Sequence, residues 1–106
     1  MRIPDKIRIG DANFNIKYKK LIDWDKNVSG QIRLNDEELI IKKGSSGKML
    51  EDTFFHEIAH GLFREMEFNY PQMSKFRNDE GFIQEFGLLL RKTFLDLLIK
   101  QGGQKH

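Results

Sequence analysis

Three residues near the middle of the chain, His56, Glu57 and His60, have the types and spacing of an H-E-x-x-H motif. Histidines four positions apart on a helix lie on one face, one turn apart, so both imidazoles can face a single metal ion. Glu57 lies about 100° around the helix axis from His56, which places its carboxylate beside the ion. The motif therefore predicts a metal site, with Glu57 as the general base that takes a proton from water.

The residues around the motif have the apolar period of a partly buried helix. The helix is expected to begin after Gly44-Ser-Ser-Gly47, whose serines are candidate caps, and to end just before Pro71. Glu51 and Asp52 are expected in the first turn, near the positive end of the helix dipole. Two histidines could also lie on a solvated helix face, but an apolar setting requires polar partners. The stripe expected to face a sheet contains Leu50, Phe54, Phe55, Ile58, Ala59, Leu62 and Met66.

A catalytic zinc site has three protein ligands and one open position, so a third ligand must come from elsewhere in the chain. The chain has no cysteine, and its remaining histidine, His106, lies in an expected tail, which leaves a carboxylate. The second predicted helix offers two, Glu80 and Glu85. Glu80 shares a helix face with Gln84 and Gly87, and the glycine would let the two helices approach closely. This geometry favours Glu80 as the ligand over Glu85, although Glu80 could also serve only the helix dipole.

Further residues are candidates for supporting roles. Gln84, one turn after Glu80, could bind the outer ring nitrogen of a ligand histidine, or could simply be solvated. Tyr70, Arg64 and Arg77 are candidates for stabilising a developing oxyanion. Of the three, Tyr70 is our candidate for this role, although it could instead pack on the end of its own helix.

The first half of the chain is predicted to form two β-hairpins. Residues 6–9 and 14–18 alternate in hydrophobicity on either side of one turn, and residues 30–34 and 39–43 on either side of another. Trp24, between the hairpins, is expected to fill the core. The fold class is therefore α+β, a small twisted antiparallel sheet of two hairpins packed on the His56 helix.

A second long helix is expected to follow. Its apolar residues recur from Phe82 to Ile99, and Asn78 is its predicted cap. With 106 residues the chain should form one domain, residues 1–100, followed by a flexible tail, residues 101–106. The net charge of +2 is too small to argue for a nucleic-acid partner. Without cysteine, a signal-like segment or a long apolar run, the expected location is the cytoplasm, with no membrane partner.

Two segments together resemble the gluzincins, zinc metallopeptidases in which a glutamate from the next helix completes an HExxH site. They are Thr53-Phe-Phe-His-Glu-Ile-Ala-His60 and Glu80-Gly-Phe-Ile-Gln-Glu-Phe-Gly87. More narrowly the chain is similar to small phage- and prophage-encoded HExxH proteins, and distantly to ImmA/IrrE-type proteases. The ImmA/IrrE branch prefers Ala-Asn where this chain has Ile83-Gln84. The family pattern places the ligand glutamate at Glu80.

The resemblance implies a minimal zincin domain with one Zn²⁺ per chain, held by His56, His60 and Glu80. The implied activity is peptide-bond hydrolysis in a peptide or protein substrate, with Glu57 as general base. The substrate is expected to pair as an extended strand with an exposed sheet edge at residues 30–34. The alternative is a non-catalytic, zinc-stabilised binding or regulatory module, such as a phage protein acting on a host protein in the host cytoplasm.

Overall fold

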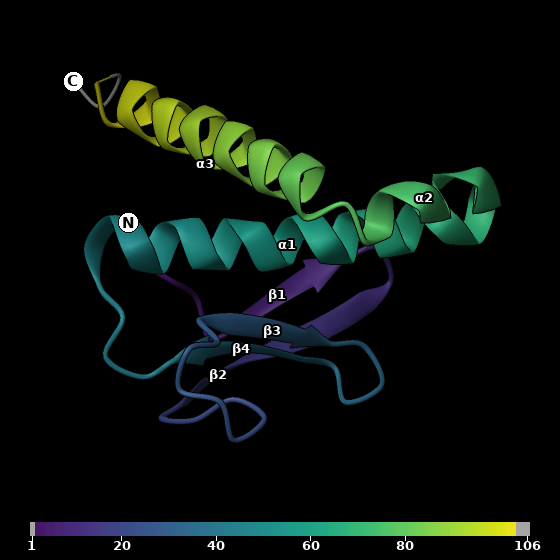
Figure 1. Ribbon diagram of the computed structural model, residues 1–106. Coiled ribbons are helices and arrows are strands. Elements are labelled where there is room, and N and C mark those ends of the chain that lie inside the picture. Colours follow the sequence, from purple (N-terminus) through teal and green to yellow (C-terminus); the bar gives the residue numbers. More distant parts are fainter. Residues whose placement is uncertain (1, 104–106) are drawn as a thin grey trace.

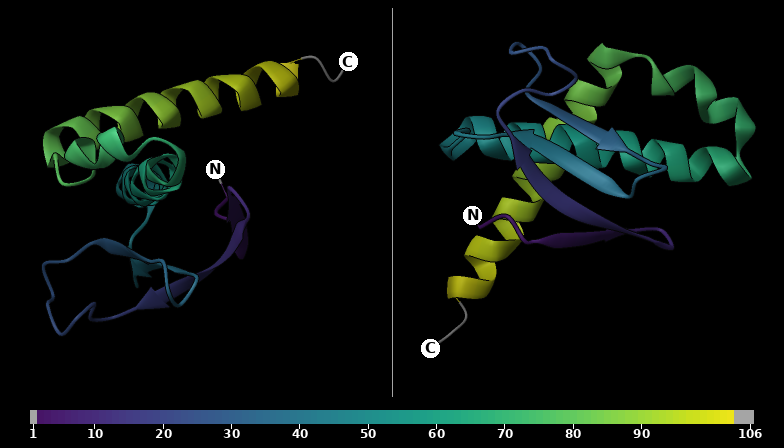
Figure 2. Two further views of the ribbon diagram at one scale, coloured as in Figure 1. Left: turned by 90° about the vertical axis from the view of Figure 1, so that its right-hand side faces the viewer. Right: turned by 90° about the horizontal axis from the view of Figure 1, so that it is seen from below.

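The computed structural model describes residues 2–103 and shows the α+β architecture that the sequence predicts (Figure 1). Helix α1 lies across one face of a four-stranded sheet, and α3 packs on the side of α1 away from the sheet (Figures 1 and 2). The elements in chain order are β1 (Lys6–Ile9), β2 (Ala12–Lys19), β3 (Gly30–Arg33), β4 (Glu38–Lys42), α1 (Gly47–Asn69), the 3₁₀ turn η1 (Pro71–Met73), α2 (Ser74–Arg77) and α3 (Glu80–Gly103).

The sheet is mixed, and the prediction of a purely antiparallel sheet was wrong. Strands β1 and β2 pair antiparallel, as do β3 and β4, so both hairpins are present. However, β2 and β4 pair in parallel, which gives the strand order β1-β2-β4-β3. Strand β4 lies in the middle of the sheet, and its residues Leu39, Ile40 and Ile41 are fully buried, as expected of a strand covered on both faces. Strand β3 is consequently an edge strand, as expected for residues 30–34.

The core lies on both sides of α1. One cluster joins the sheet to α1, and a second joins α1 to α3. Because α1 is held on both sides, the orientation of its polar residues is fixed by the packing around them. The buried members are Ile16, Leu39, Ile41, Phe54, Phe55 and Ile58 in the first cluster, and Ala59, Phe63 and Ile83 in the second.

Trp24 does not fill the core. Its side chain is 91% exposed, whereas Ile22, two residues earlier, is fully buried. Asp23 and Trp24 both adopt left-handed backbone conformations, with φ of 53° and 60°. The turn at these two residues explains the difference, because it buries the smaller isoleucine and directs the large indole to solvent.

The helix ends differ in part from the sequence predictions. Ser46 precedes α1 but makes no side-chain capping hydrogen bond. Glu51 and Asp52 lie beyond the first turn, and both contact Arg91 of α3, at 3.1 and 3.4 Å. At α3 the cap is not Asn78 but the next residue, Asp79, whose carboxylate accepts a hydrogen bond from the N–H of Phe82 at 3.0 Å. This Asp79 cap places Glu80 in the first turn of α3.

Helix α3 extends to Gly103, which is three residues into the segment 101–106 that was expected to be a tail. Residues 104–106, which include His106, lie outside the described residues. In the part of the chain that the structure describes, no helix is long and apolar enough to cross a membrane.

Candidate metal centre

Helices α1 and α3 bring His56, His60 and Glu80 together. The two imidazoles lie on one face of α1 with ring centroids 4.9 Å apart, as their four-residue spacing predicts. Glu80 approaches from the first turn of α3, with one carboxylate oxygen 3.2 Å from Nε2 of His56 and the other 3.3 Å from Nε2 of His60. Glu85, the alternative ligand, is exposed and is not part of this group.

The group has the donor types and spacing of a metal site. Its ligand atoms, two imidazole nitrogens and a carboxylate oxygen, lie within 4.8 Å of one another. In a tetrahedral site with metal–ligand distances of about 2.1 Å, neighbouring ligand atoms are roughly 3.4 Å apart. The His–Glu distances of 3.2 and 3.3 Å are close to that separation. His56, His60 and Glu80 could therefore hold a metal ion.

Gly87 allows α3 to approach α1 at the site. A Cβ atom at this position would lie 3.1 Å from the Cα and 3.2 Å from the backbone nitrogen of His56, and 3.3 Å from the carbonyl oxygen of Phe55. All three atoms belong to the α1 backbone, which cannot rotate away as a side chain can. The absence of a side chain at Gly87 thus allows α3 to lie close to the backbone of α1 at His56.

This contact makes Gly87→Ala an informative variant. Replacing glycine by alanine within a helix normally stabilises by roughly 0.5–1 kcal/mol, whereas overpacking costs about 1–3 kcal/mol. We expect Gly87→Ala to lower the free energy of unfolding in urea and to weaken metal binding. Gly81→Ala, on the same helix, is the control, because its Cβ would meet only a carboxylate oxygen of Asp79 at 3.6 Å. Equal stability of the two variants would contradict the close helix contact.

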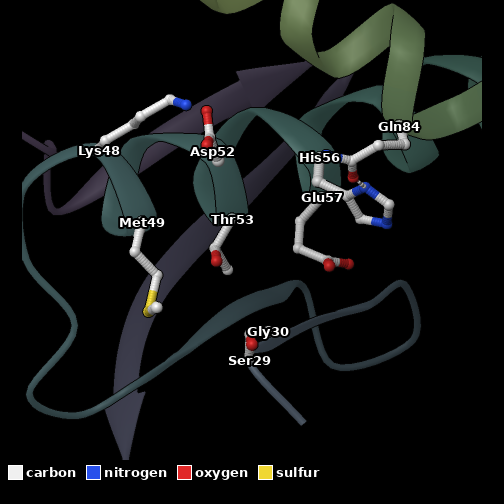
Figure 3. Close-up of a pocket in the computed structure, with 9 residues that line it drawn as sticks. All are labelled: Ser29, Gly30, Lys48, Met49, Asp52, Thr53, His56, Glu57 and Gln84. Atoms are coloured by element: carbon white, nitrogen blue, oxygen red, sulfur yellow. Dashed lines mark hydrogen bonds between the residues drawn. The ribbon is translucent and has the colours of Figure 1, made fainter.

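Gln84 contacts the first histidine of the group. Its Oε1 lies 2.8 Å from Nδ1 of His56 (Figure 3), on the ring nitrogen that faces away from Glu80. An amide oxygen only accepts hydrogen bonds, so this contact places the proton on Nδ1 and leaves the Nε2 lone pair toward Glu80. The hydrogen bond predicted between Gln84 and the outer ring nitrogen of a histidine is therefore present.

Glu57 lies beside the His-His-Glu group and is not part of it. Its side chain points toward β3 (Figure 3) and is 7% exposed. The pKa of Glu57 is raised to about 7, mainly by burial; His56 lowers it, the nearby carboxylate of Glu80 raises it, and a hydrogen bond from the backbone N–H of Ile32 lowers it. A carboxylate with a pKa near neutrality is a stronger base than an ordinary glutamate.

The surroundings of the second histidine, His60, favour its neutral form. Burial lowers the pKa of His60 below its usual value and His56 adds to this effect, while Glu80 opposes it. A metal ligand must present a free lone pair, so a neutral imidazole is the form that binds. The lowered pKa of His60 thus favours the neutral form that can bind an ion.

A groove runs between α1 and β3 and crosses the site. It consists of two cavities that both border Gly30, His56 and Glu57. The first has a volume of about 510 Å³ and lies toward the start of α1 (Figure 3). The second, of about 370 Å³, includes His60 and Glu80. The other lining residues are Ser29, Lys48, Met49, Asp52, Thr53 and Gln84 in the first cavity, and Gln31, Ile32, Leu34, Arg64 and Arg77 in the second.

The structure does not bring Tyr70 to the site. Tyr70 follows the last residue of α1, ten residues after His60, or about 15 Å along the helix axis at 1.5 Å per residue, and it does not line either cavity of the groove. Arg64 and Arg77 do line the second cavity, and each has a guanidinium nitrogen near Oε2 of Glu67, at 3.5 and 3.3 Å. These two arginines are thus better placed than Tyr70 to meet a developing negative charge.

The sequence placed a substrate strand at the edge of β3 but did not predict that β3 contacts Glu57. Gly30 faces α1 so closely that a Cβ there would lie 2.5 Å from Cγ2 of Thr53 and 3.3 Å from Cγ of Glu57. The N–H of Ile32 reaches the Glu57 carboxylate. No local pattern could have identified this backbone donor, because it depends on how the sheet edge meets the helix.

Comparison with protein-family models, with curated proteins and with solved structures gave no significant match to this chain. What the chain does must therefore be inferred from the side chains and backbone groups that α1, α3 and β3 bring together.

Proposed function

We propose that this chain is a zinc-dependent peptidase, a minimal gluzincin, in which Glu57 acts as the general base. The observation that carries the proposal is the placement of Glu57. It is a buried carboxylate next to a His-His-Glu group, and it is not one of the group's ligands. A metal that only stabilised the fold would need His56, His60 and Glu80 but not this fourth polar group.

The donor set favours zinc. Two imidazoles and one carboxylate from this chain match the ligands of hydrolytic zinc sites, which keep one position open. When bound, Zn²⁺ would supply Lewis-acid chemistry, polarising a carbonyl group and making water more acidic. His56, His60 and Glu80 would hold the ion, and Gln84 would keep the His56 ring in the orientation and tautomer that bind it.

Glu57 would move the proton. Its carboxylate is held in place by the N–H of Ile32 and, with a pKa of about 7, can accept a proton near neutral pH. The same carboxyl group can then donate the proton to the leaving amine, as a general acid. Burial keeps bulk water from competing for the proton.

The edge of β3 is suited to hold a peptide. The N–H of Lys42 donates to the carbonyl of Ser29 at 2.9 Å. In an antiparallel pair, residues that bond to the neighbouring strand alternate with residues that do not. The backbone groups of Gly30 and Ile32 therefore point away from β4. The Ile32 N–H is used by Glu57, which leaves the Gly30 N–H and both carbonyls for a substrate strand. A peptide paired at this edge would lie in the groove, across the metal-binding group.

A peptide-library digestion tests the proposal. We expect the zinc-loaded chain to cleave internal peptide bonds, with the new termini identified by mass spectrometry. Chelation should stop the cleavage and re-addition of zinc should restore it. If a chain shown by elemental analysis to carry zinc cleaves no member of the library, the peptidase proposal is wrong.

A further inference from the structure

The face of the sheet opposite α1 has a distinct character. Seen from below, the strands lie in front of α1 and no helix covers them (Figure 2, right). The connection between β2 and β3 folds over part of this outer face, where Ile40 and Ile22 are fully buried. The rest of the face belongs mainly to β1 and β2.

The outer face is strongly basic, although the whole chain carries a net charge of only +2. Side chains alternate along each strand, so the residues beside the inward Ile7, Phe14, Ile16 and Leu39 point outward. The outward cations are Lys6, Arg8, Lys17, Lys19, Arg33 and Lys42, against one outward carboxylate on the strands, Glu38.

Much of this positive charge is not neutralised. Arg33 pairs with Asp23 at 2.8 Å, and Arg8 lies 3.6 Å from Asp11. Lys6, Lys17 and Lys19 form no ion pair with any other residue in the range 2–103. Lys17 and Lys19 are two positions apart on β2, which separates their Cα atoms by roughly 7 Å, similar to the phosphate spacing of an extended nucleic-acid strand, and Lys6 lies opposite Asn15 on the neighbouring strand.

Trp24 lies in the connection that leaves β2 beside Lys19. Its side chain is 91% exposed and its backbone is left-handed, at φ 60°, which bulky residues rarely adopt. The preceding Asp23 anchors this conformation by accepting hydrogen bonds from Gln31 at 2.6 Å and Arg33 at 2.8 Å. A strained backbone that holds an exposed indole beside a basic sheet is poorly explained by folding alone, since the indole stabilises no core.

We propose that this outer face binds single-stranded nucleic acid. Lys6, Lys17 and Lys19 contact phosphates, and Trp24 stacks on a base, the combination used by sequence-tolerant single-strand binders. The outward amides of Asn13 and Asn15, which lie among these cations, favour nucleic acid over an anionic membrane because they can hydrogen-bond to base edges. The proposal does not depend on the metal site, which is on the other side of the sheet.

Fluorescence and anisotropy titrations with a labelled thymidine oligonucleotide of about 12 residues test it. Trp24 is the only tryptophan, so stacking should quench the intrinsic emission directly. Trp24→Ala, followed by the oligonucleotide label, should bind roughly 5- to 150-fold more weakly. Between about 50 and 200 mM salt, Lys17→Glu should lower the log–log salt slope by at least ~0.7, the value for one phosphate contact.

Lys92→Glu is the matched control, because it makes the same charge change at an exposed position on α3. It should bind like the parent, and chelator-treated protein should give the same titration. Equal weakening by Lys92→Glu and Lys17→Glu would overturn the proposal, as would the absence of both quenching and an anisotropy change. A blue shift of Trp24 emission with phosphatidylserine vesicles, without oligonucleotide binding, would assign the face to a membrane and also overturn it.

Discussion

Glu57→Gln is expected to abolish peptide cleavage while zinc remains bound. The amide has the shape of the carboxylate and can still accept the hydrogen bond from the Ile32 N–H, so the local packing should be kept. It cannot accept a proton from water, and a general base typically contributes ~10²–10⁴-fold to the rate. The rate on a peptide that the parent cleaves and the zinc content of the same sample are the two measurements.

Glu65→Gln is a suitable control, because it makes the same substitution on α1 at a position outside the two cavities at the metal site. It should cleave at the parental rate. Glu57→Gln should also unfold at the same or a higher urea concentration, since an uncharged amide replaces a carboxyl group that burial disfavours in its charged form. A Glu57→Gln protein that cleaves as fast as the parent would remove the general base from the mechanism.

The burial of Glu57 also favours the proposed peptidase over the alternative of a non-catalytic, zinc-stabilised module. Placing an ionisable group where it is 7% exposed opposes folding unless its partners compensate. Ile32 supplies one hydrogen bond, but burial still raises the pKa of Glu57 to about 7. A carboxylate whose burial beside His56 and Glu80 opposes folding is more readily explained by proton transfer than by structural support.

Residues on helices were the most predictable part of the site. The four-residue spacing of His56 and His60 fixes their relative position on any helix, and the offsets of four and seven placed Gln84 and Gly87 on the face of Glu80. Each of these relations is local to a single helix. The sequence could not reveal that Gly30 and the Ile32 N–H meet Glu57, because this contact requires a particular placement of the sheet edge.

The same distinction applies to the fold. Each hairpin was predictable because its strands alternate and its turn lies between them in sequence. The parallel pairing of β2 and β4 joins two strands that β3 separates in sequence. Alternation within a strand carries no information about which other strand lies next to it. The prediction for Trp24 failed for a related reason. Side-chain size favours burial in general, but the left-handed turn at Asp23 and Trp24 directs Ile22 inward instead.

The metal content should follow the three ligands. We expect one zinc per chain by elemental analysis, removed by chelation and by His56→Ala or His60→Ala. Glu80→Gln should weaken zinc binding by at least ~10–100-fold, because metal sites lose that much even when an outer partner is removed. A competition titration with a chromophoric chelator measures the affinity of each variant directly, without requiring any peptidase activity.

Glu85→Gln provides the matched comparison for Glu80→Gln. Both substitutions remove one carboxylate from α3, but only Glu80 lies 3.2 and 3.3 Å from the two histidines. Glu85→Gln should therefore bind zinc like the parent. The reverse result would make Glu85 the ligand and would require α3 to rotate about its axis, which the close contact of Gly87 with the backbone of His56 opposes. The zinc affinities of the two variants thus test the helix packing and the ligand assignment together.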